Sequence, residues 1–201
     1  QVGVVGCGIM GAGIAQVCAQ SGYQVIVSEV SDELLHKGLD SINRMLTRGV
    51  EKGKISPPEV EAILGRIKGT TDMGLLKDVD FVVEAVIENL DLKKSVFGEL
   101  DELCAPEVIL TTNTSSMSLT EIAAATKRPD KVCGMHFFNP APIMRLVEVI
   151  RGYFTSDETV KITTELARKM GKVTVEVKKD SPGFIVNRIM IPHMLEAIKI
   201  V

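Results

Sequence analysis

One histidine and one acid in this chain have the types and spacing suited to proton transfer. His136 lies in an apolar run, 132–137, that is typical of a strand, and Glu148 lies in a second such run, 146–150. An unpaired carboxylate is costly in apolar surroundings, so we expect Glu148 to hydrogen-bond His136. A histidine at a strand end is by itself more often structural. The neighbouring acid favours a general base, because it would fix the imidazole tautomer and stabilise the protonated ring.

A polar cluster at 113–116 follows another predicted strand, 108–111. Side chains at this position lie at the carboxyl edge of a parallel sheet, where such sheets bind ligands. We expect the Ser115 hydroxyl to hydrogen-bond a substrate oxygen there. The alternative is an N-cap for the next helix, a role that Ser116 or Ser118 can also fill.

Asn187 lies in Gly183-Phe184-Ile185-Val186-Asn187-Arg188, within an otherwise apolar helical segment. A buried amide needs hydrogen-bond partners. A substrate carbonyl, or the network of His136 and Ser115, would supply them. A hydrogen bond from the helix to a loop is an equal alternative.

A glycine-rich loop near the first residue has the pattern of a dinucleotide-binding turn. Gly6, Gly8 and Gly11 fit G-x-G-x-x-G between a predicted strand, 2–6, and a predicted helix, 10–20. The first glycine makes the tight turn, the second lets the backbone approach a pyrophosphate, and the third lets the helix pack closely on the strand. The alternative is a glycine turn chosen for packing alone.

The residues around this loop favour NAD over NADP. Ile9 and Met10 offer free N–H groups at the positive end of a helix dipole, which suits a pyrophosphate. Glu29 follows the second predicted strand, 23–27, and is suited to accept hydrogen bonds from the adenosine ribose. Its charge would repel a 2′-phosphate, and no Arg or Lys precedes Lys37.

These residues require a doubly wound α/β domain to bring them together. Strand and helix patterns alternate, and the strands are almost continuously apolar, which predicts a mainly parallel sheet with helices on both faces. Besides those already named, strands are predicted at 67–70 and 81–84, and helices from Ser31 to Lys52 and after Ser56-Pro57.

The composition indicates a soluble globular protein. The 201 residues are 45% hydrophobic and 24% charged, and a net charge of −3 gives no footprint for nucleic acid or an anionic membrane. No apolar run approaches the roughly 18–20 residues that span a bilayer. The four cysteines are widely spaced, so we expect free thiols in a reducing compartment, with no disulfide and no metal site.

The last segment predicts a second domain. After the Rossmann-type domain, 1–181, residues 182–201 form a helical pattern that is apolar around most of its circumference. We expect this to be the first helix of a truncated C-terminal helical domain. The alternative is a terminal helix that docks on the α/β domain or on a partner chain.

In order along nearly the whole chain, several motifs resemble those of the 3-hydroxyacyl-CoA dehydrogenase family. They are Gly-Cys-Gly-Ile-Met-Gly-Ala-Gly from Gly6, Glu84-Ala85-Val86-Ile87-Glu88-Asn89, Asn113 to Ser116, His136-Phe137-Phe138-Asn139-Pro140, and Asp180 to Arg188. The resemblance implies NAD-dependent, reversible oxidation of an L-3-hydroxyacyl-CoA, of the 3-hydroxybutyryl type.

The resemblance also implies residue roles. His136 matches the base and Glu148 its orienting acid, while Ser115 and Asn187 match the groups that hold the reacting oxygens. Glu88, Lys93 and Asn139 match positions that line the nicotinamide half of the cofactor site. Asn113 and Ser115 are also expected to bind the cofactor.

The implied partners are an acyl-CoA substrate and a second copy of the chain. The family forms dimers through its helical domain, and a cytoplasmic location in bacteria, or else the mitochondrial matrix, follows from the resemblance. Arg48, Lys52 and Lys54 are candidates for the CoA phosphates. A solvated helix end is an equal alternative, because Glu51 interrupts this basic group.

Three other functions fit parts of the pattern. They are a non-catalytic, crystallin-like dinucleotide-binding protein, a related hydroxy-acid dehydrogenase of the L-gulonate type, and one segment of a multifunctional β-oxidation protein. The presence of His136, Glu148, Ser115 and Asn187 together argues against the first.

Overall fold

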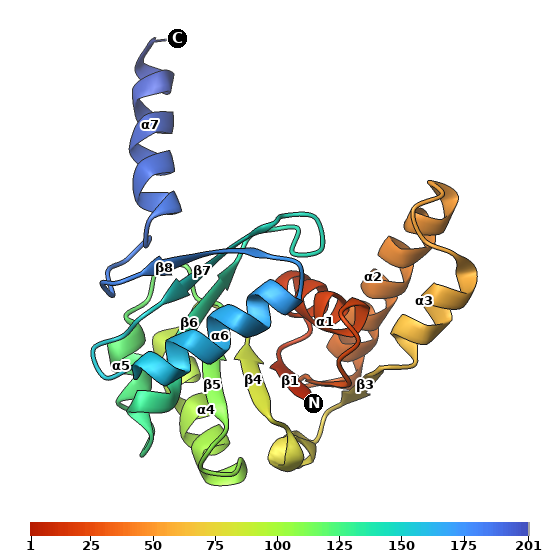
Figure 1. Cartoon of the computed structure of the whole chain (residues 1–201), viewed down its shortest axis with the longest axis horizontal. Coiled ribbons are helices and arrows are strands. Elements are labelled where there is room, and N and C mark those ends of the chain that lie inside the picture. The colour runs from red at the N-terminus through yellow and green to blue at the C-terminus, as the bar shows by residue number, and fades with distance from the viewer. Residues whose placement is uncertain (201) are drawn as a thin grey trace.

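An eight-stranded sheet forms the centre of the molecule in the computed structural model, which describes residues 1–200 (Figure 1). The strand order is β3-β2-β1-β4-β5-β6-β7-β8. The first six strands run parallel to one another, whereas β7 runs antiparallel to β6 and β8 runs parallel to β7. The predicted mainly parallel, doubly wound sheet is therefore confirmed. The strands are β1 (Val2–Val5), β2 (Val25–Ser28), β3 (Ile67–Thr70), β4 (Phe81–Glu84), β5 (Ile109–Thr112), β6 (Val132–Phe137), β7 (Leu146–Ile150) and β8 (Val173–Val177).

Helices cover both faces of the sheet, and each face has its own apolar core. The helices are α1 (Ile9–Gln20), α2 (Asp32–Glu51), α3 (Pro57–Leu64), α4 (Leu90–Leu103), α5 (Leu119–Ala123), α6 (Asp157–Lys169) and α7 (Val186–Ile200), with short 3-10 helices η1 (Met73–Asp78) and η2 (Pro129–Lys131). One core joins the sheet to α1, α2, α3 and α6, and the other joins it to η1, α4 and α5.

Successive side chains of a strand point to opposite faces of the sheet, and this places the polar residues at the ends of β4, β5 and β6 on one face. In β4, Val83 packs with the α1 side and Val82 with the α4 side, so Glu84 belongs to the α4 side. By the same alternation, His136 shares the face of Val132. The polar residues at the carboxyl ends of β4, β5 and β6 therefore lie on one side of the sheet, above α4 and α5.

Side-chain caps set where the long helices begin. The Ser31 hydroxyl accepts a hydrogen bond from Leu34 N at the start of α2. The Asn89 side chain does the same for Leu92 N in α4, and Ser156 caps α6. These caps satisfy backbone donors that have no partner within the helix.

Most predicted elements are confirmed, although several bounds differ and one strand was missed. β1 ends at Val5 rather than Gly6, and α1 begins at Ile9 rather than Met10. β5 lies one residue later than predicted, because its pairing with β4 places Ile109 opposite Phe81 and Thr112 opposite Glu84. Residues 25–28, rather than 23–27, pair with β1 as the second strand. The edge strand β8 was not predicted, although its valines alternate with polar residues as an edge strand requires.

Helix α7 projects away from the rest of the molecule (Figure 1). None of its residues is buried, and Ile189, Leu195 and Ile198 are each more than half exposed. The prediction of an apolar helix over this segment is confirmed for residues 186–200. Val201, which was assigned to the same helix, lies outside the described residues. Within residues 1–200, no helix has both the length and the apolar character needed to cross a bilayer.

Backbone conformation and close packing explain two of the three loop glycines. Gly6 has a φ of +95°, and a Cβ there would lie 2.7 Å from Ala85 O. A Cβ on Gly11 would lie 1.8 Å from Gly6 O. A Cβ on Gly8 would meet no atom within 4 Å, so packing does not explain that glycine.

Alanine at Gly11 and alanine at Gly8 are therefore expected to affect stability differently. Gly11→Ala forces the backbone of α1 away from β1 and should lower stability by about 1–3 kcal/mol. For a chain of this size that corresponds to a Tm lower by roughly 3–10 °C. Gly8→Ala should change stability by no more than about 0.5 kcal/mol. Thermal unfolding of both variants beside the parent chain measures this, and equal Tm values for the two would contradict the packing account.

Candidate active site

His136 and Glu148 form a buried hydrogen-bonded pair across two strands. They are directly opposite in the antiparallel register of β6 and β7. The His136 Nδ1 atom lies 2.7 Å from Glu148 Oε2, and both side chains are buried. The predicted pairing of this histidine and this acid is confirmed as geometry. Because Nδ1 is engaged by the carboxylate, the other ring nitrogen, Nε2, is the one left for a ligand.

The second carboxylate oxygen of Glu148 binds the start of helix α7. Glu148 Oε1 accepts hydrogen bonds from Ile185 N at 3.0 Å and Val186 N at 2.9 Å. Burial acts to raise the pKa of Glu148, but the hydrogen bonds from His136, Val186 and Ile185 outweigh it and lower the pKa below its ordinary value. The carboxylate is thus charged near neutral pH and holds the imidazole on one side and the helix on the other.

Aromatic rings surround the imidazole. The Phe138 ring centroid lies 4.5 Å from that of His136, and the Phe184 centroid lies 5.6 Å away in an edge-on arrangement. These rings leave His136 only 5% exposed. The surroundings hold the histidine in one place and restrict water around it.

The loop after β5 brings Ser115 to the same edge of the sheet. Asn113 Oδ1 accepts a hydrogen bond from Phe137 N at 2.8 Å, which ties this loop to the residue next to His136. Ser118, rather than Ser115 or Ser116, caps helix α5. The side chain of Ser115 is therefore not needed as a cap, which removes the structural alternative for this residue.

Asp180, which is distant in the sequence, binds the loop between β5 and α5 and the start of α5. Its carboxylate accepts hydrogen bonds from Leu119 N, Thr120 N and the hydroxyls of Ser118 and Thr120. Sequence reasoning assigned no role to this residue. Asp180 lies two residues before Pro182 and far along the sequence from α5, so no local pattern indicates this contact.

Glu88 and Lys93 lie beside the Ser115 loop. Glu88 accepts hydrogen bonds from Ser115 N at 2.9 Å and from the Thr114 hydroxyl at 2.8 Å. The Lys93 ammonium lies 3.8 Å from Glu88 Oε2 but is 1% exposed. It pairs with Glu84, a fully buried acid that sequence reasoning did not select. Lys93 therefore reaches the surface of the site only through Glu88.

The glycine loop and Glu29 form one side of a cleft. Glu29 Oε2 accepts a hydrogen bond from Cys7 N, and Oε1 accepts one from Val30 N, both at 2.7 Å. The acid thereby ties the loop to the end of β2. The cleft beside it is lined by Cys7, Gly8, Ile9, Glu29, Leu34, Lys37, Gly38, Ser41 and Arg44.

The residues of this cleft fit a dinucleotide. The open space above Gly8 leaves room for a pyrophosphate close to the backbone, and the start of α1 supplies the donors there. Glu29 lines the same cleft and supplies a carboxylate that could accept hydrogen bonds from ribose hydroxyls. Burial, with the charge of Glu29, raises the pKa of the Cys7 thiol in the loop to about 11, which favours the protonated thiol.

Two further clefts continue along helix α2. One is lined by Ser41, Arg44, Met45 and Arg48. The other lies between α1, α2 and the loop after β6, where its lining includes Gln16, Ser41, Met45 and Asn139. Lys52 and Lys54 are exposed at the end of α2 and line none of these clefts.

The structure connects some predicted site residues directly and leaves others apart. His136 is bonded to Glu148, and Ser115 is bonded to Glu88. Asn187 lies in the first turn of α7, next to Val186, whose N–H is held by Glu148. Its side chain is half-buried, not buried as predicted, and within residues 1–200 it makes no hydrogen bond to His136 or Ser115.

Comparison with known proteins places this geometry in a family. The family model for the 3-hydroxyacyl-CoA dehydrogenase NAD binding domain matches residues 1–181. The chain is 49% identical to a probable 3-hydroxybutyryl-CoA dehydrogenase of Deinococcus radiodurans, over 99% of this chain and 71% of that protein. It is 48% identical to a 3-hydroxybutyryl-CoA dehydrogenase of Clostridioides difficile, over 100% of this chain and 71% of that protein.

A solved structure agrees. The crystal structure of (S)-3-hydroxybutyryl-CoA dehydrogenase from Ralstonia eutropha matches with a TM-score of 0.95 and 45% identity, over 98% of this chain and 69% of that chain. The resemblance drawn from the motifs, the doubly wound fold and the choice of NAD are thus all confirmed. The chain belongs to the 3-hydroxyacyl-CoA dehydrogenase family of NAD-dependent oxidoreductases.

Proposed function

We propose that this chain catalyses the reversible, NAD-dependent oxidation of an L-3-hydroxyacyl-CoA to the 3-ketoacyl-CoA, with 3-hydroxybutyryl-CoA as the substrate. The buried pair of His136 and Glu148 at the carboxyl edge of the sheet is the observation that carries this proposal. The names of the relatives, 3-hydroxybutyryl-CoA dehydrogenases, support the choice of substrate.

In the proposed mechanism His136 acts as the general base. When bound, NAD would supply the acceptor for the hydride from carbon 3 of the substrate. His136 Nε2 takes the proton of the hydroxyl at that carbon, so the C–H and O–H bonds break and a carbonyl forms. Glu148 holds Nδ1–H and stabilises the imidazolium that results. In the reverse direction the imidazolium returns the proton to the oxygen.

Ser115 and Asn187 are proposed to bind the reacting oxygens. The Ser115 hydroxyl is free of a capping role, and its backbone is fixed by Glu88. Asn187 stands one residue after Val186, so the hydrogen bonds of Glu148 position it relative to the histidine. The same acid thereby orients the base and places a second substrate-binding side chain.

For the cofactor we propose Gly6, Gly8, Ile9, Met10, Gly11 and Glu29 around the adenosine and pyrophosphate, with Glu88, Asn113, Ser115 and Asn139 on the nicotinamide side. Lys93 belongs to this side as a buried neighbour of Glu88, not as a direct contact. This division follows the rule that a dinucleotide lies across the point where the strand order reverses, here between β1 and β4.

Replacement of the base tests the proposed activity. In the protein that carries this chain, His136→Gln should lower kcat/KM for acetoacetyl-CoA reduction by roughly 10²–10⁴-fold, the usual contribution of a general base. The affinity for NADH should not change. NADH consumption and NADH fluorescence titration measure the two quantities.

The matched control is His36→Gln, which changes an exposed histidine of α2 that lines none of the clefts. It should behave like the parent protein. If His136→Gln keeps full activity, or if the parent protein binds NADH without reducing acetoacetyl-CoA, the proposed reaction is wrong.

The CoA phosphates are proposed to bind along one face of α2. Arg44 and Arg48 stand four residues apart, so they lie on one face of this helix, and Lys52 is the residue directly after the helix ends. Arg44 and Arg48 also line the cleft that continues from the cofactor loop. Lys54, the third candidate, lies beyond the end of the helix and is the weakest of the set.

Removal of two of these charges should weaken substrate binding selectively. Arg48→Ala with Lys52→Ala should raise the KM for acetoacetyl-CoA about tenfold, because each charge-assisted contact to a phosphate contributes a fraction of that factor. The KM for NADH should stay the same. Lys161→Ala with Lys169→Ala on α6 removes the same charge elsewhere and is the control. An unchanged KM for acetoacetyl-CoA would contradict the proposed binding of the CoA phosphates along α2.

Helix α7 is proposed to begin a second, helical domain at residue 182 and to join two copies of the chain. Its apolar side chains are exposed along the whole helix, so another surface is needed to remove them from water. Ile191 and Leu195 are 52% and 55% exposed and stand four residues apart, on one face.

A chain of residues 1–201 should therefore self-associate. Ile191→Lys with Leu195→Lys should return it to a monomer, as measured by light scattering after size-exclusion chromatography. Glu196→Gln with Lys199→Gln alters the polar side of the same helix and should leave association intact. A parent chain that is already monodisperse and monomeric would contradict this use of α7.

A further inference from the structure

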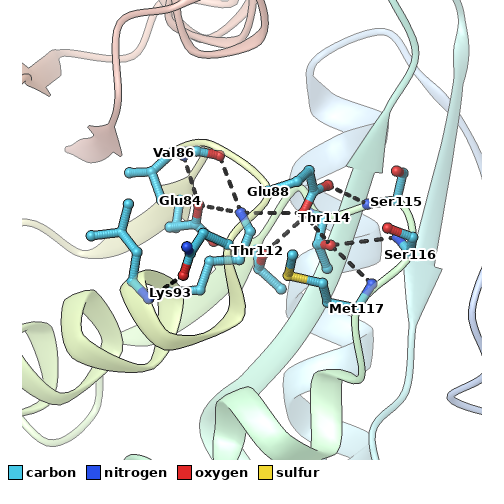
Figure 2. A network of polar contacts seen from close by, with 11 residues as sticks. Glu84, Val86, Glu88, Lys93, Thr112, Thr114, Ser115, Ser116 and Met117 are labelled. Carbon is cyan, nitrogen blue, oxygen red and sulfur yellow. Dashed lines mark hydrogen bonds and ion pairs between the residues drawn. The ribbon is translucent and has the colours of Figure 1, made fainter.

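A buried acid behind the cofactor site has no role in the proposed mechanism. Glu84 ends strand β4 and is fully buried. Its Oε1 accepts hydrogen bonds from Lys93 Nζ and Val86 N, and its Oε2 accepts one from the Thr112 hydroxyl, each at 2.7 Å (Figure 2). Every one of these donors comes from a different segment: α4, the loop after β4, and β5.

Lys93 links this buried acid to the surface of the site. Its ammonium donates to Glu84 and to Val86 O at 3.2 Å, and lies 3.8 Å from Glu88 Oε2 (Figure 2). Glu88 is the outward member, with 43% of its side chain exposed, whereas Lys93 and Glu84 are shielded from water. Glu88 in turn holds the backbone of Ser115.

The three charges do not cancel. Two carboxylates, Glu84 and Glu88, face one ammonium, Lys93, so the cluster has a net charge of −1. Charges that are shielded from water act over longer distances than surface charges do. Any group bound above Glu88 therefore experiences a negative field.

The strand order indicates that the nicotinamide half of the cofactor lies above Glu88. Glu29 and the glycine loop take the adenosine and pyrophosphate on the β1–β2 side. The other half must then lie over the ends of β4 and β5, where Glu88 and Ser115 stand. The nicotinamide ring is positively charged when oxidised and neutral when reduced, so a negative field distinguishes the two forms.

We propose that Glu84 is a positioning residue that, through Lys93, sets the charge beside the nicotinamide and so favours oxidised over reduced cofactor. Without Glu84, the ammonium of Lys93 would neutralise Glu88, and the preference would be lost. With Glu84 present, Lys93 is held inward and Glu88 keeps its negative charge toward the ligand. This inference rests on the proposed cofactor site, and it concerns the relative affinity for NAD+ and NADH, not the chemical step.

The ratio of the two dissociation constants, Kd for NAD+ over Kd for NADH, tests the inference directly. Glu84→Gln keeps the shape of the side chain and changes the cluster to zero net charge. It should raise this ratio by roughly three- to tenfold, as expected for one partly screened charge at this range. Lys93→Met changes the cluster to −2 and should lower the ratio by a similar factor. The double variant restores −1 and should return the ratio to the parent value.

Two controls separate charge from structure. Thr112→Val removes a hydrogen bond to Glu84 without a change of charge and should leave the ratio unchanged, even if Tm falls. Thermal unfolding of every variant reports on folding. If Glu84→Gln does not fold, the double variant, which contains no unpaired buried charge, is compared with Lys93→Met, in which Glu84 keeps only its hydrogen bonds from Val86 N and the Thr112 hydroxyl. Equal ratios in these two variants would overturn the inference.

Every outcome of these binding measurements either supports or overturns the inference. NADH fluorescence titration and calorimetry with NAD+, both at pH 8 without substrate, measure the two constants. Ratios that follow the net charge support the inference. Ratios that are equal in all variants, or a double variant that differs from the parent as much as the single variants do, overturn it. If the parent binds neither nucleotide, the proposed cofactor site itself has failed.

Discussion

The carboxylate of Glu148 links three segments on which the candidate active site depends. It is fully buried in β7, and a charge in such a place is stable only when its oxygens are well bonded. His136 on β6 meets one oxygen, and the N–H groups of Ile185 and Val186 meet the other. The strand that departs from the parallel sheet, the imidazole and the start of α7 are therefore positioned by one side chain.

The antiparallel turn between β6 and β7 makes this contact possible. Because β7 returns along β6, residues twelve apart in sequence face each other, and strand alternation directs both His136 and Glu148 to the α4 side of the sheet. Glu84 and Thr112 emerge on the same side from β4 and β5. The proton-transfer pair and the charged cluster of Glu84, Lys93 and Glu88 thus share one edge and one face, although they come from separate segments.

The sequence was sufficient for the elements that carry a strong local pattern. The G-x-G-x-x-G turn, the apolar strands and the pair of His136 with Glu148 follow from spacing and from the cost of a buried acid, and the structure confirms them as geometry. Contacts made over long distances in the sequence were not predicted. Asp180 holds the loop before α5 from some 60 residues away, and Glu84 accepts a hydrogen bond from Thr112, 28 residues further along the chain.

The exposure of side chains was also hard to predict. Lys93 was predicted on the nicotinamide side of the cofactor site, and its ammonium is directed inward, where it pairs with the buried carboxylate of Glu84. Asn187 was expected to be buried, but α7 projects from the domain and leaves it half-buried. Both cases depend on tertiary contacts that a single segment does not contain.

The central claim is that His136 and Glu148 act as one unit, and a double-mutant cycle on kcat/KM tests it most directly. His136→Gln, Glu148→Gln and the double variant are compared with the parent protein in acetoacetyl-CoA reduction. Gln at position 148 can still accept the hydrogen bonds from the start of α7. If Glu148 acts through the histidine, the double variant should lose no more than about threefold beyond His136→Gln alone, because residues that act as a unit are strongly non-additive. Losses that multiply would show that the two residues act independently, and the account of the site would be wrong.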